Sequence, residues 1–341
     1  MKPLVFFLCL GASLACAQPK ALFYMTDNPG SVKSFTAHAD KVDILVPAWY
    51  SVDATGLVSG GPNPDVLKTA SAHHVPIMPI VALMTQADLH KLFITPDARN
   101  AFMTGLVNEC KRHGYSGFQI DFENVDWTDR DLLSKLVADT ASALHRGNLQ
   151  LTIATVPNAP GSPGKSAYSK WLYANWRLGY DLKALAQSVD LICLMTYDQN
   201  TRWTMPGPVG GYPWTVANLD YALQFVPKEK LSLGIALYGY HWYAGEPGKE
   251  EKPNPTADYI GQDDIDQYLA AYHPQVQWDP VDRTSWFYFY ADDYREWVFF
   301  TDKRGFGERL NLVRDRGLQG FCSWVLGTED PEIWSLLPSH K

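Results

Sequence analysis

The sequence predicts an α/β protein of the (β/α)8 TIM-barrel class, with a small α+β insertion before the last strand. Eight short β-rich runs follow one another along the chain, and a helical pattern follows most of them. The runs are almost continuously apolar, which is typical of parallel strands covered by helices on both faces. Because eight repeats of strand then helix favour closure over an open sheet, we expect a barrel.

The eight predicted strands span residues 21–26, 42–50, 75–82, 117–123, 149–157, 189–198, 230–240 and 317–327. The clearest helix follows the fourth strand, over residues 128–147, and five of its apolar side chains share a face: Leu132, Leu133, Leu136, Val137 and Leu144. Thr128 and Asp131 predict a capping box at its start, and Gly147 predicts its C-terminal cap.

The insertion is predicted from the unusually long spacing between the seventh and eighth strands. Residues 241–300 hold polar, proline-bearing and aromatic segments, which we interpret as an α+β subdomain. The barrel is then formed by residues 18–240 and 301–341. The sequence has no internal repeat or low-complexity linker that would favour two independent domains.

The first 17 residues have the pattern of a signal peptide, with a basic start, an apolar run and small residues on both sides of Cys16. We therefore expect a secreted or periplasmic protein. A second interpretation makes Cys16 a lipid-bearing residue, although Ser13 stands where an aliphatic side chain is usual. The apolar run is too short for a membrane-spanning helix and no second run of about 20 apolar residues follows, so no integral membrane segment is expected.

Composition excludes several classes of partner. A net charge of −8 with scattered lysines and arginines disfavours nucleic acid, while 46% hydrophobic residues, 12 Trp and 18 Tyr indicate a globular protein with aromatic-lined surfaces. Beyond the leader only Cys110, Cys193 and Cys322 remain, an odd number without metal-ligand spacing. The histidines also lack such spacing, so we expect no metal and no cofactor. Nothing in the sequence predicts an oligomeric state.

The stretch YSGFQIDFENVD, residues 115–126, places two acids in an apolar, aromatic run. Side chains alternate along a strand, so Gln119, Asp121 and Glu123 share one face and the apolar residues between them take the other. In a barrel the polar face lines the lumen, and Glu123 falls at the C-terminal end of the fourth strand, where such barrels keep their active sites. A carboxyl beside a second carboxylate among aromatic rings has a raised pKa, which suits a general acid. The structural alternative is an ion-pair network inside the barrel.

The run GYSGFQIDFEN resembles the DxxDxDxE signature of glycoside hydrolase family 18, the chitinase-type barrel. Three further stretches resemble motifs of that family in the same order: LMTYD at 194–198, KLSLGIALYGYHW at 230–242 and GFCSWVLG at 320–327. The likeness covers nearly all of the chain beyond the leader. Its details are most similar to the bacterial branch that includes spore-cortex and peptidoglycan-directed N-acetylglucosaminidases.

The resemblance implies a role for each matching residue. Glu123 would protonate the glycosidic oxygen, and Asp121 would orient a 2-acetamido group whose carbonyl oxygen attacks the anomeric carbon. Tyr197 would donate its hydroxyl to that oxygen. This substrate-assisted route retains configuration and differs from the usual two-carboxylate mechanism. The implied substrate-binding residues are Gln119, Met195, Asp198, Trp324 and Tyr24. The substrate would be an oligo- or polysaccharide of N-acetylhexosamine, either chitin-type or peptidoglycan.

Two positions depart from the signature, because Ser116 and Gln119 stand where the family has aspartates. An amide cannot take up a proton as a carboxylate can. We therefore expect Gln119 to hydrogen-bond Asp121, and Asp121 to stay ionised over a wider pH range than in proteins with the full signature.

Two questions remain open at this point. A non-catalytic, lectin-like barrel is the alternative to an enzyme, but such a protein typically lacks the acid, and Glu123, Asp121 and Tyr197 are all present. In the loop after the sixth strand, Arg202 and two tryptophans, Trp203 and Trp214, either contact distal sugars or are ordinary loop residues.

Overall fold

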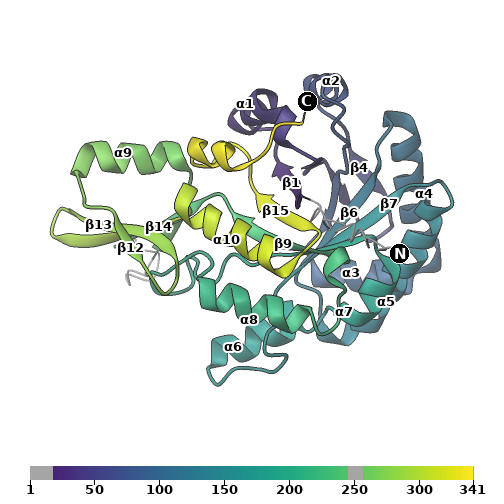
Figure 1. Cartoon of the computed structure of the whole chain (residues 1–341). Coiled ribbons are helices and arrows are strands. Elements are labelled where there is room, and N and C mark those ends of the chain that lie inside the picture. Colours follow the sequence, from purple (N-terminus) through teal and green to yellow (C-terminus); the bar gives the residue numbers. More distant parts are fainter. Residues whose placement is uncertain (1–17, 245–255, 341) are drawn as a thin grey trace, which may run out of the picture.

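A curled sheet forms the centre of the molecule in the computed structural model, which describes residues 18–244 and 256–340 (Figure 1). The predicted signal peptide, residues 1–17, lies outside the described residues. Helices surround the curled sheet, and a second sheet with its own helix projects to one side (Figure 1).

Eight parallel strands of the described chain form the barrel: β1 (Lys20–Met25), β2 (Ile44–Pro47), β5 (Ile80–Leu83), β6 (Gly117–Phe122), β7 (Gln150–Thr155), β8 (Leu191–Leu194), β9 (Leu231–Ala236) and β15 (Gly320–Trp324). A parallel bridge between Leu45 and Ile77 closes the ring from β2 to the segment that leads into β5. A hairpin of β3 (Tyr50–Val52) and β4 (Val58–Gly60) extends the sheet beside β5. The predicted barrel class is confirmed.

The helices around the barrel are α1 (Pro29–His38), α2 (Pro64–Ala72), α3 (Gln86–Ile94), α4 (Pro96–His113), α5 (Arg130–His145), α6 (Ala167–Leu172), α7 (Leu182–Ser188), α8 (Tyr212–Ala222) and α10 (Lys303–Arg316). Short turns include η2 (Trp127–Asp129), a π-helical turn η3 (Tyr173–Arg177) and η4 (Lys228–Lys230). Within the described residues, every helix is too short or too polar to cross a membrane.

The predicted caps of α5 are wrong at both ends. At the start, the Asp126 carboxylate accepts hydrogen bonds from the Thr128 N–H (2.9 Å) and hydroxyl (2.6 Å), which begins η2 before the α-helix and leaves no capping box. At the end, Asn148 rather than Gly147 takes the left-handed conformation, with φ 55°. Asparagine tolerates that conformation better than most residues with a Cβ.

Alternation along β6 divides its side chains between two cores. Phe118, Ile120 and Phe122 are fully buried in the layer between the sheet and the helices. Each such side chain contributes roughly 1.5–3 kcal/mol through burial. The lumen holds a separate apolar cluster that includes Tyr24, Met78, Ile80, Cys193 and Cys322. The polar residues of β6 therefore face the lumen, as predicted.

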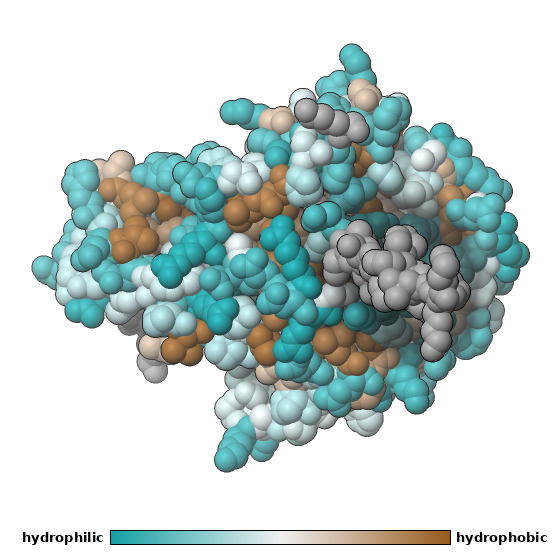
Figure 2. All heavy atoms as spheres, viewed as in Figure 1, coloured by the Kyte–Doolittle hydropathy of each residue, from teal (hydrophilic) through white to brown (hydrophobic). Residues whose placement is uncertain are grey.

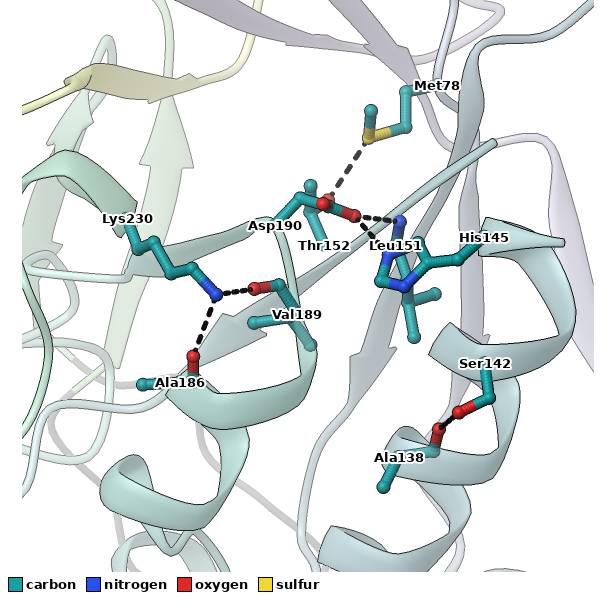
Figure 3. A network of polar contacts seen from close by, with 10 residues as sticks. All are labelled: Met78, Ala138, Ser142, His145, Leu151, Thr152, Ala186, Val189, Asp190 and Lys230. Carbon is teal, nitrogen blue, oxygen red and sulfur yellow. Dashed lines mark hydrogen bonds and ion pairs between the residues drawn. The ribbon is translucent and has the colours of Figure 1, made fainter. Parts of the chain in front are cut away.

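A network of polar contacts ties the N-terminal ends of the strands together (Figure 3). The Lys230 ammonium donates to the carbonyl oxygens of Ala186 (3.0 Å) and Val189 (2.9 Å), which joins η4 to the end of α7. The Asp190 carboxylate accepts from the Leu151 N–H (2.8 Å) and contacts His145 Nε2 (2.9 Å). These contacts fix the starts of β7 and β8, whose other ends carry the site.

The second sheet is antiparallel and, in the described residues, has the order β11 (Thr256–Ile260), β10 (Gly239–Tyr243), β14 (Tyr294–Phe300), β13 (Thr284–Ala291), β12 (Gln277–Asp279). The predicted seventh run, 230–240, therefore divides, because its last residues belong to β10. Helix α9 (Gln262–Tyr272) packs on one face through Ile265. Hydrophobic atoms gather between α9 and these strands, at the left of Figure 2.

Arg309 of α10 anchors this sheet to the barrel. Its buried guanidinium donates to the carbonyl oxygens of Gly210, Asp282, Arg283 and Gly305. Burial lowers the pKa of Arg309 to about 10, so it stays charged at neutral pH. One side chain thus joins α10 to the segment before β13 and to the loop after β8.

We predict that Lys230→Met lowers the free energy of unfolding by roughly 1.5–3 kcal/mol, since two carbonyl oxygens lose a charged donor. Urea unfolding followed by circular dichroism measures the change. The matched control is Lys183→Met, which alters an exposed lysine of α7. Equal midpoints for the two variants would show that the Lys230 contacts do not stabilise the fold.

Candidate active site

A cavity of about 350 Å³ opens at the C-terminal ends of the barrel strands. Glu123 enters it from the end of β6, Pro157 from the segment after β7, Tyr197 and Asp198 from the segment after β8, and Tyr240 from β10. This is the end of the barrel at which catalytic residues gather.

Glu123 is positioned by two hydrogen bonds to the peptide group that joins it to Phe122. Its N–H donates to the Leu83 carbonyl oxygen (3.2 Å), which continues the ladder between β5 and β6. The buried Tyr180 hydroxyl donates to the carbonyl oxygen of Phe122 (2.6 Å). Asp121 lies two residues earlier on the same strand and is only 8% exposed. Among the described residues, no side chain or N–H donates to its buried Oδ1.

Both carboxyls have raised pKa values, and the rise is larger for Glu123. Burial raises the pKa of Asp121 to about 6. Burial, together with the charges of Asp121 and Asp198, raises the pKa of Glu123 to about 8. Both shifts favour the neutral carboxyl, and more strongly for Glu123, which is placed at the cavity to donate a proton. The raised pKa predicted for Glu123 is confirmed. That Asp121 stays ionised over a wider pH range than in proteins with the full signature stays a prediction.

The hydrogen bond expected between Gln119 and Asp121 does not form. The Nε2 of Gln119 donates instead to Thr152 Oγ1 (3.0 Å) and contacts Cys193 Sγ (3.3 Å). The reason is geometric: Thr152 is the register partner of Gln119 on β7, about 4.8 Å away between strands, whereas Asp121 is about 6.6 Å along the same strand. The other departure, Ser116, donates to the Ile77 carbonyl oxygen (3.0 Å) at the opposite end of the barrel.

Asp198 is held in an uncommon backbone conformation at the cavity wall. Its φ is 58°, a left-handed value that few residues with a Cβ adopt. Its Oδ1 accepts hydrogen bonds from the hydroxyls of Tyr238 (2.6 Å) and Tyr240 (3.3 Å). Burial raises the pKa of Asp198, and the two tyrosine bonds oppose that rise. The carboxylate is thus fixed toward the cavity, where its charge acts on Glu123.

The structure divides the predicted residues by depth. Four of them line the cavity: Glu123, Met195, Tyr197 and Asp198. Gln119, Asp121 and Tyr24 are buried in the lumen. Trp324, at the end of β15, packs on Tyr24 with ring centroids 5.4 Å apart and against the cluster that holds Met195 and Tyr197. Trp324 therefore lies next to the cavity lining.

Several cavity residues were not predicted, because they lie in the short helix α6 and the turn η3, which are too short to show a helical periodicity. Tyr168, Trp171, Trp176 and Arg177 come from the segment between β7 and α7, and Tyr168 stacks on Trp171 with centroids 6.1 Å apart. The density of aromatic residues directly after a strand end was the available signal. Arg202, Trp203 and Trp214, left open from the sequence, also line the cavity. No cluster of three or more potential metal ligands occurs in the described part of the chain.

Comparison with known proteins agrees with this geometry. The sequence profile of Glycosyl hydrolases family 18 matches residues 21–329. The cortical fragment-lytic enzyme of Bacillus subtilis is 25% identical over 286 residues, which are 79% of this chain and 61% of that protein. The Bacillus anthracis enzyme of the same name is 26% identical over 240 residues, 70% of this chain and 53% of that protein. The chain thus spans little more than half the length of these relatives.

Among solved structures, the chitinase from Chromobacterium violaceum ATCC 12472 superposes with a TM-score of 0.82 and 26% identity, covering 93% of this chain and 97% of that chain. The spore cortex-lytic enzyme SleL of Bacillus megaterium superposes with a TM-score of 0.81 and 21% identity, covering 94% of this chain and 73% of that one. The barrel and the second sheet therefore have close counterparts of known structure.

We predict that Glu123→Gln stabilises the protein at alkaline pH. The folded carboxyl, with a pKa of about 8, holds its proton where the unfolded one, near 4.5, has released it. The folded state binds more protons in that window, so unfolding becomes easier as pH rises from about 4.5 to about 8. Glutamine does not titrate, so the variant lacks this pH-dependent loss of stability. Because Glu123 faces the cavity, we expect the variant's free energy of unfolding above pH 8 to exceed that of the unmodified protein by only about 1–3 kcal/mol.

Thermal unfolding of both proteins between pH 5 and 9 measures the gain. The surface variant Glu229→Gln controls for the loss of one negative charge. A difference between Glu123→Gln and the unmodified protein that does not grow with pH would contradict the raised pKa.

Proposed function

We propose that this chain, which belongs to the glycosyl hydrolases family 18, hydrolyses β-linked N-acetylhexosamine glycans, chitin-type or peptidoglycan, with retention of configuration. The observation that carries the proposal is the placement of two carboxyls on one strand face, with Glu123 at the cavity and the buried Asp121 two residues earlier, where burial raises the pKa of both. One strand face thus supplies both groups that the reaction needs, a proton donor and an anion.

In the first step, Glu123 gives its proton to the glycosidic oxygen as the bond to the anomeric carbon breaks. The carbonyl oxygen of the substrate's own 2-acetamido group attacks the same carbon, so the positive charge spreads over a five-membered oxazolinium ring. Asp121 accepts a hydrogen bond from the acetamido N–H. Its buried Oδ1, which has no donor among the described residues, is available for that bond. Tyr197 donates its hydroxyl to the acetamido carbonyl oxygen.

In the second step, the ionised Glu123 removes a proton from a water molecule that attacks the anomeric carbon. The bond between the acetamido oxygen and the anomeric carbon breaks, which restores the acetamido group. Glu123 keeps the proton taken from water, and the product has the configuration of the substrate. Two displacements at one carbon give net retention. Asp198 supports the cycle by raising the pKa of Glu123, so that the acid is protonated when each turnover begins.

The aromatic lining suits a sugar chain. Trp171, Trp176, Trp203 and Trp214 offer ring faces on which the apolar faces of sugars stack. A lectin-like barrel would use the same rings, but it would not need a buried, unpaired Asp121 beneath a protonated Glu123, which is costly to maintain. These residues favour the hydrolase.

We predict that Glu123→Gln lowers kcat on chitin oligosaccharides by roughly 10²–10⁴-fold, because the general acid is lost. Asp121→Asn should also lower kcat strongly, since an amide does not balance the oxazolinium charge. Chromatography of the products measures the rate, and proton NMR identifies the anomer first released. Asp139→Asn, on the exposed face of α5, is the control. Release of the inverted anomer, or full activity in Glu123→Gln, would overturn the mechanism.

A fully N-deacetylated oligosaccharide provides a second arm of this test. It lacks the acetamido nucleophile, so it should bind without being cut. Cleavage of it at a comparable rate would exclude substrate assistance.

We predict a bell-shaped profile of kcat/KM against pH, with limbs near 6 and 8, because Asp121 must be ionised and Glu123 protonated. Asp198→Asn removes a negative charge beside Glu123 and should move the alkaline limb to lower pH. The acidic limb should move less, since burial alone raises the pKa of Asp121. An alkaline limb that stays in place would show that Asp198 does not tune the acid.

A further inference from the structure

Two arginines line the cavity and form no ion pair with any described residue. Arg177 ends the π-helical turn η3, and Arg202 lies in the loop after β8. Among the described residues, the ion pairs of arginine involve other positions, so neither guanidinium has a carboxylate within reach. The Nε of Arg177 is buried and has no hydrogen-bond partner in the described structure. Arg202 rests over the ring of Trp203 at 5.6 Å.

This arrangement carries a cost in free energy. A guanidinium that loses water without gaining an acceptor costs free energy, and burial lowers the pKa of Arg177 accordingly. The described carboxyls of the cavity do not pair with these arginines. Burial favours the neutral form of Glu123, and Asp198 is held by the hydroxyls of Tyr238 and Tyr240. Within the described residues, the cavity wall therefore holds two guanidinium groups outside any ion pair.

We propose that Arg177 and Arg202 form a carboxylate-binding subsite, which makes the preferred substrate an acidic glycan whose N-acetylhexosamine neighbours carry a carboxylate. The inference rests on the proposed function and adds to it the chemical class of the substrate. Guanidinium groups bind carboxylates through two parallel hydrogen bonds, a geometry that a neutral hydroxyl does not match.

The surrounding rings support the assignment. Trp171 and Trp176 line the cavity together with Arg177, and Trp203 with Arg202. Each arginine thus stands among rings that can hold the face of a sugar while the guanidinium binds a substituent at its edge. Two kinds of sugar have this chemistry: muramic acid, through its lactyl ether, and a uronic acid, through its ring carboxylate.

The test compares kcat/KM on four glycans of matched length. They are peptide-free peptidoglycan strands, the same strands with their carboxyls reduced to alcohols, chitin oligosaccharides and hyaluronan oligosaccharides. The unmodified protein should prefer a carboxylated glycan over its neutral counterparts. The peptidoglycan and hyaluronan arms identify which acidic sugar the subsite takes.

Arg177→Gln should lower kcat/KM on the preferred acidic glycan by roughly ten- to a hundredfold, as expected for the loss of a charged hydrogen-bond pair, and leave chitin oligosaccharides within about threefold. Arg177→Lys keeps the charge and should recover part of the loss. Arg202→Gln alters an exposed side chain, so its effect does not depend on folding. Arg146→Gln, at the exposed end of α5, is the matched control.

Equal losses on acidic and neutral glycans, or no preference in the unmodified protein, would overturn the subsite while leaving the proposed hydrolase intact. If no glycan is cleaved, the proposed function fails. Calorimetry of the unmodified protein with native and carboxyl-reduced strands then decides the subsite separately. Tighter binding of the native strands, lost in Arg177→Gln and Arg202→Gln, supports it, and equal affinities refute it.

Discussion

Two carboxyl groups on one face of a buried strand cannot both be ionised cheaply. Burial in the lumen raises the pKa of both Asp121 and Glu123, and the charges of Asp121 and Asp198 raise that of Glu123 further. Several neighbouring groups maintain this environment. The Tyr180 bond holds the end of β6, Asp198 adds a third carboxyl beside the pair, and Oδ1 of Asp121 has no donor among the described residues.

The barrel makes this arrangement possible because it separates the groups that stabilise the fold from the groups that face the cavity. Lys230 and Asp190 form hydrogen bonds with backbone groups at the N-terminal end of the barrel, whereas Glu123 lies at its C-terminal end. The lumen between the two ends is filled by apolar side chains such as Met78 and Ile80. The acids are thus isolated from water below and open to a ligand above.

Much of this could be predicted from periodicity, and the failures have physical causes. The alternation of β6 placed Gln119, Asp121 and Glu123 in the lumen, and eight apolar runs predicted the barrel. The partner of Gln119 could not be predicted, because it depends on the register between β6 and β7. The boundary between β9 and β10 was invisible, since both halves of the run 230–240 read as one strand. Trp171 lies in α6, and Trp176 and Arg177 lie in η3. These elements are too short for periodicity to predict which side chains face the cavity.

The anchor at Arg309 has a consequence for how such a protein can diversify. A single guanidinium holds both the segment before β13 and the loop after β8, the loop that carries Arg202 and Trp203, whereas the carboxyls stand on β6. Remodelling of the appended sheet can therefore retune which polymers are admitted while the reacting groups keep their places. Substrate specificity and catalytic chemistry can therefore evolve separately within one chain.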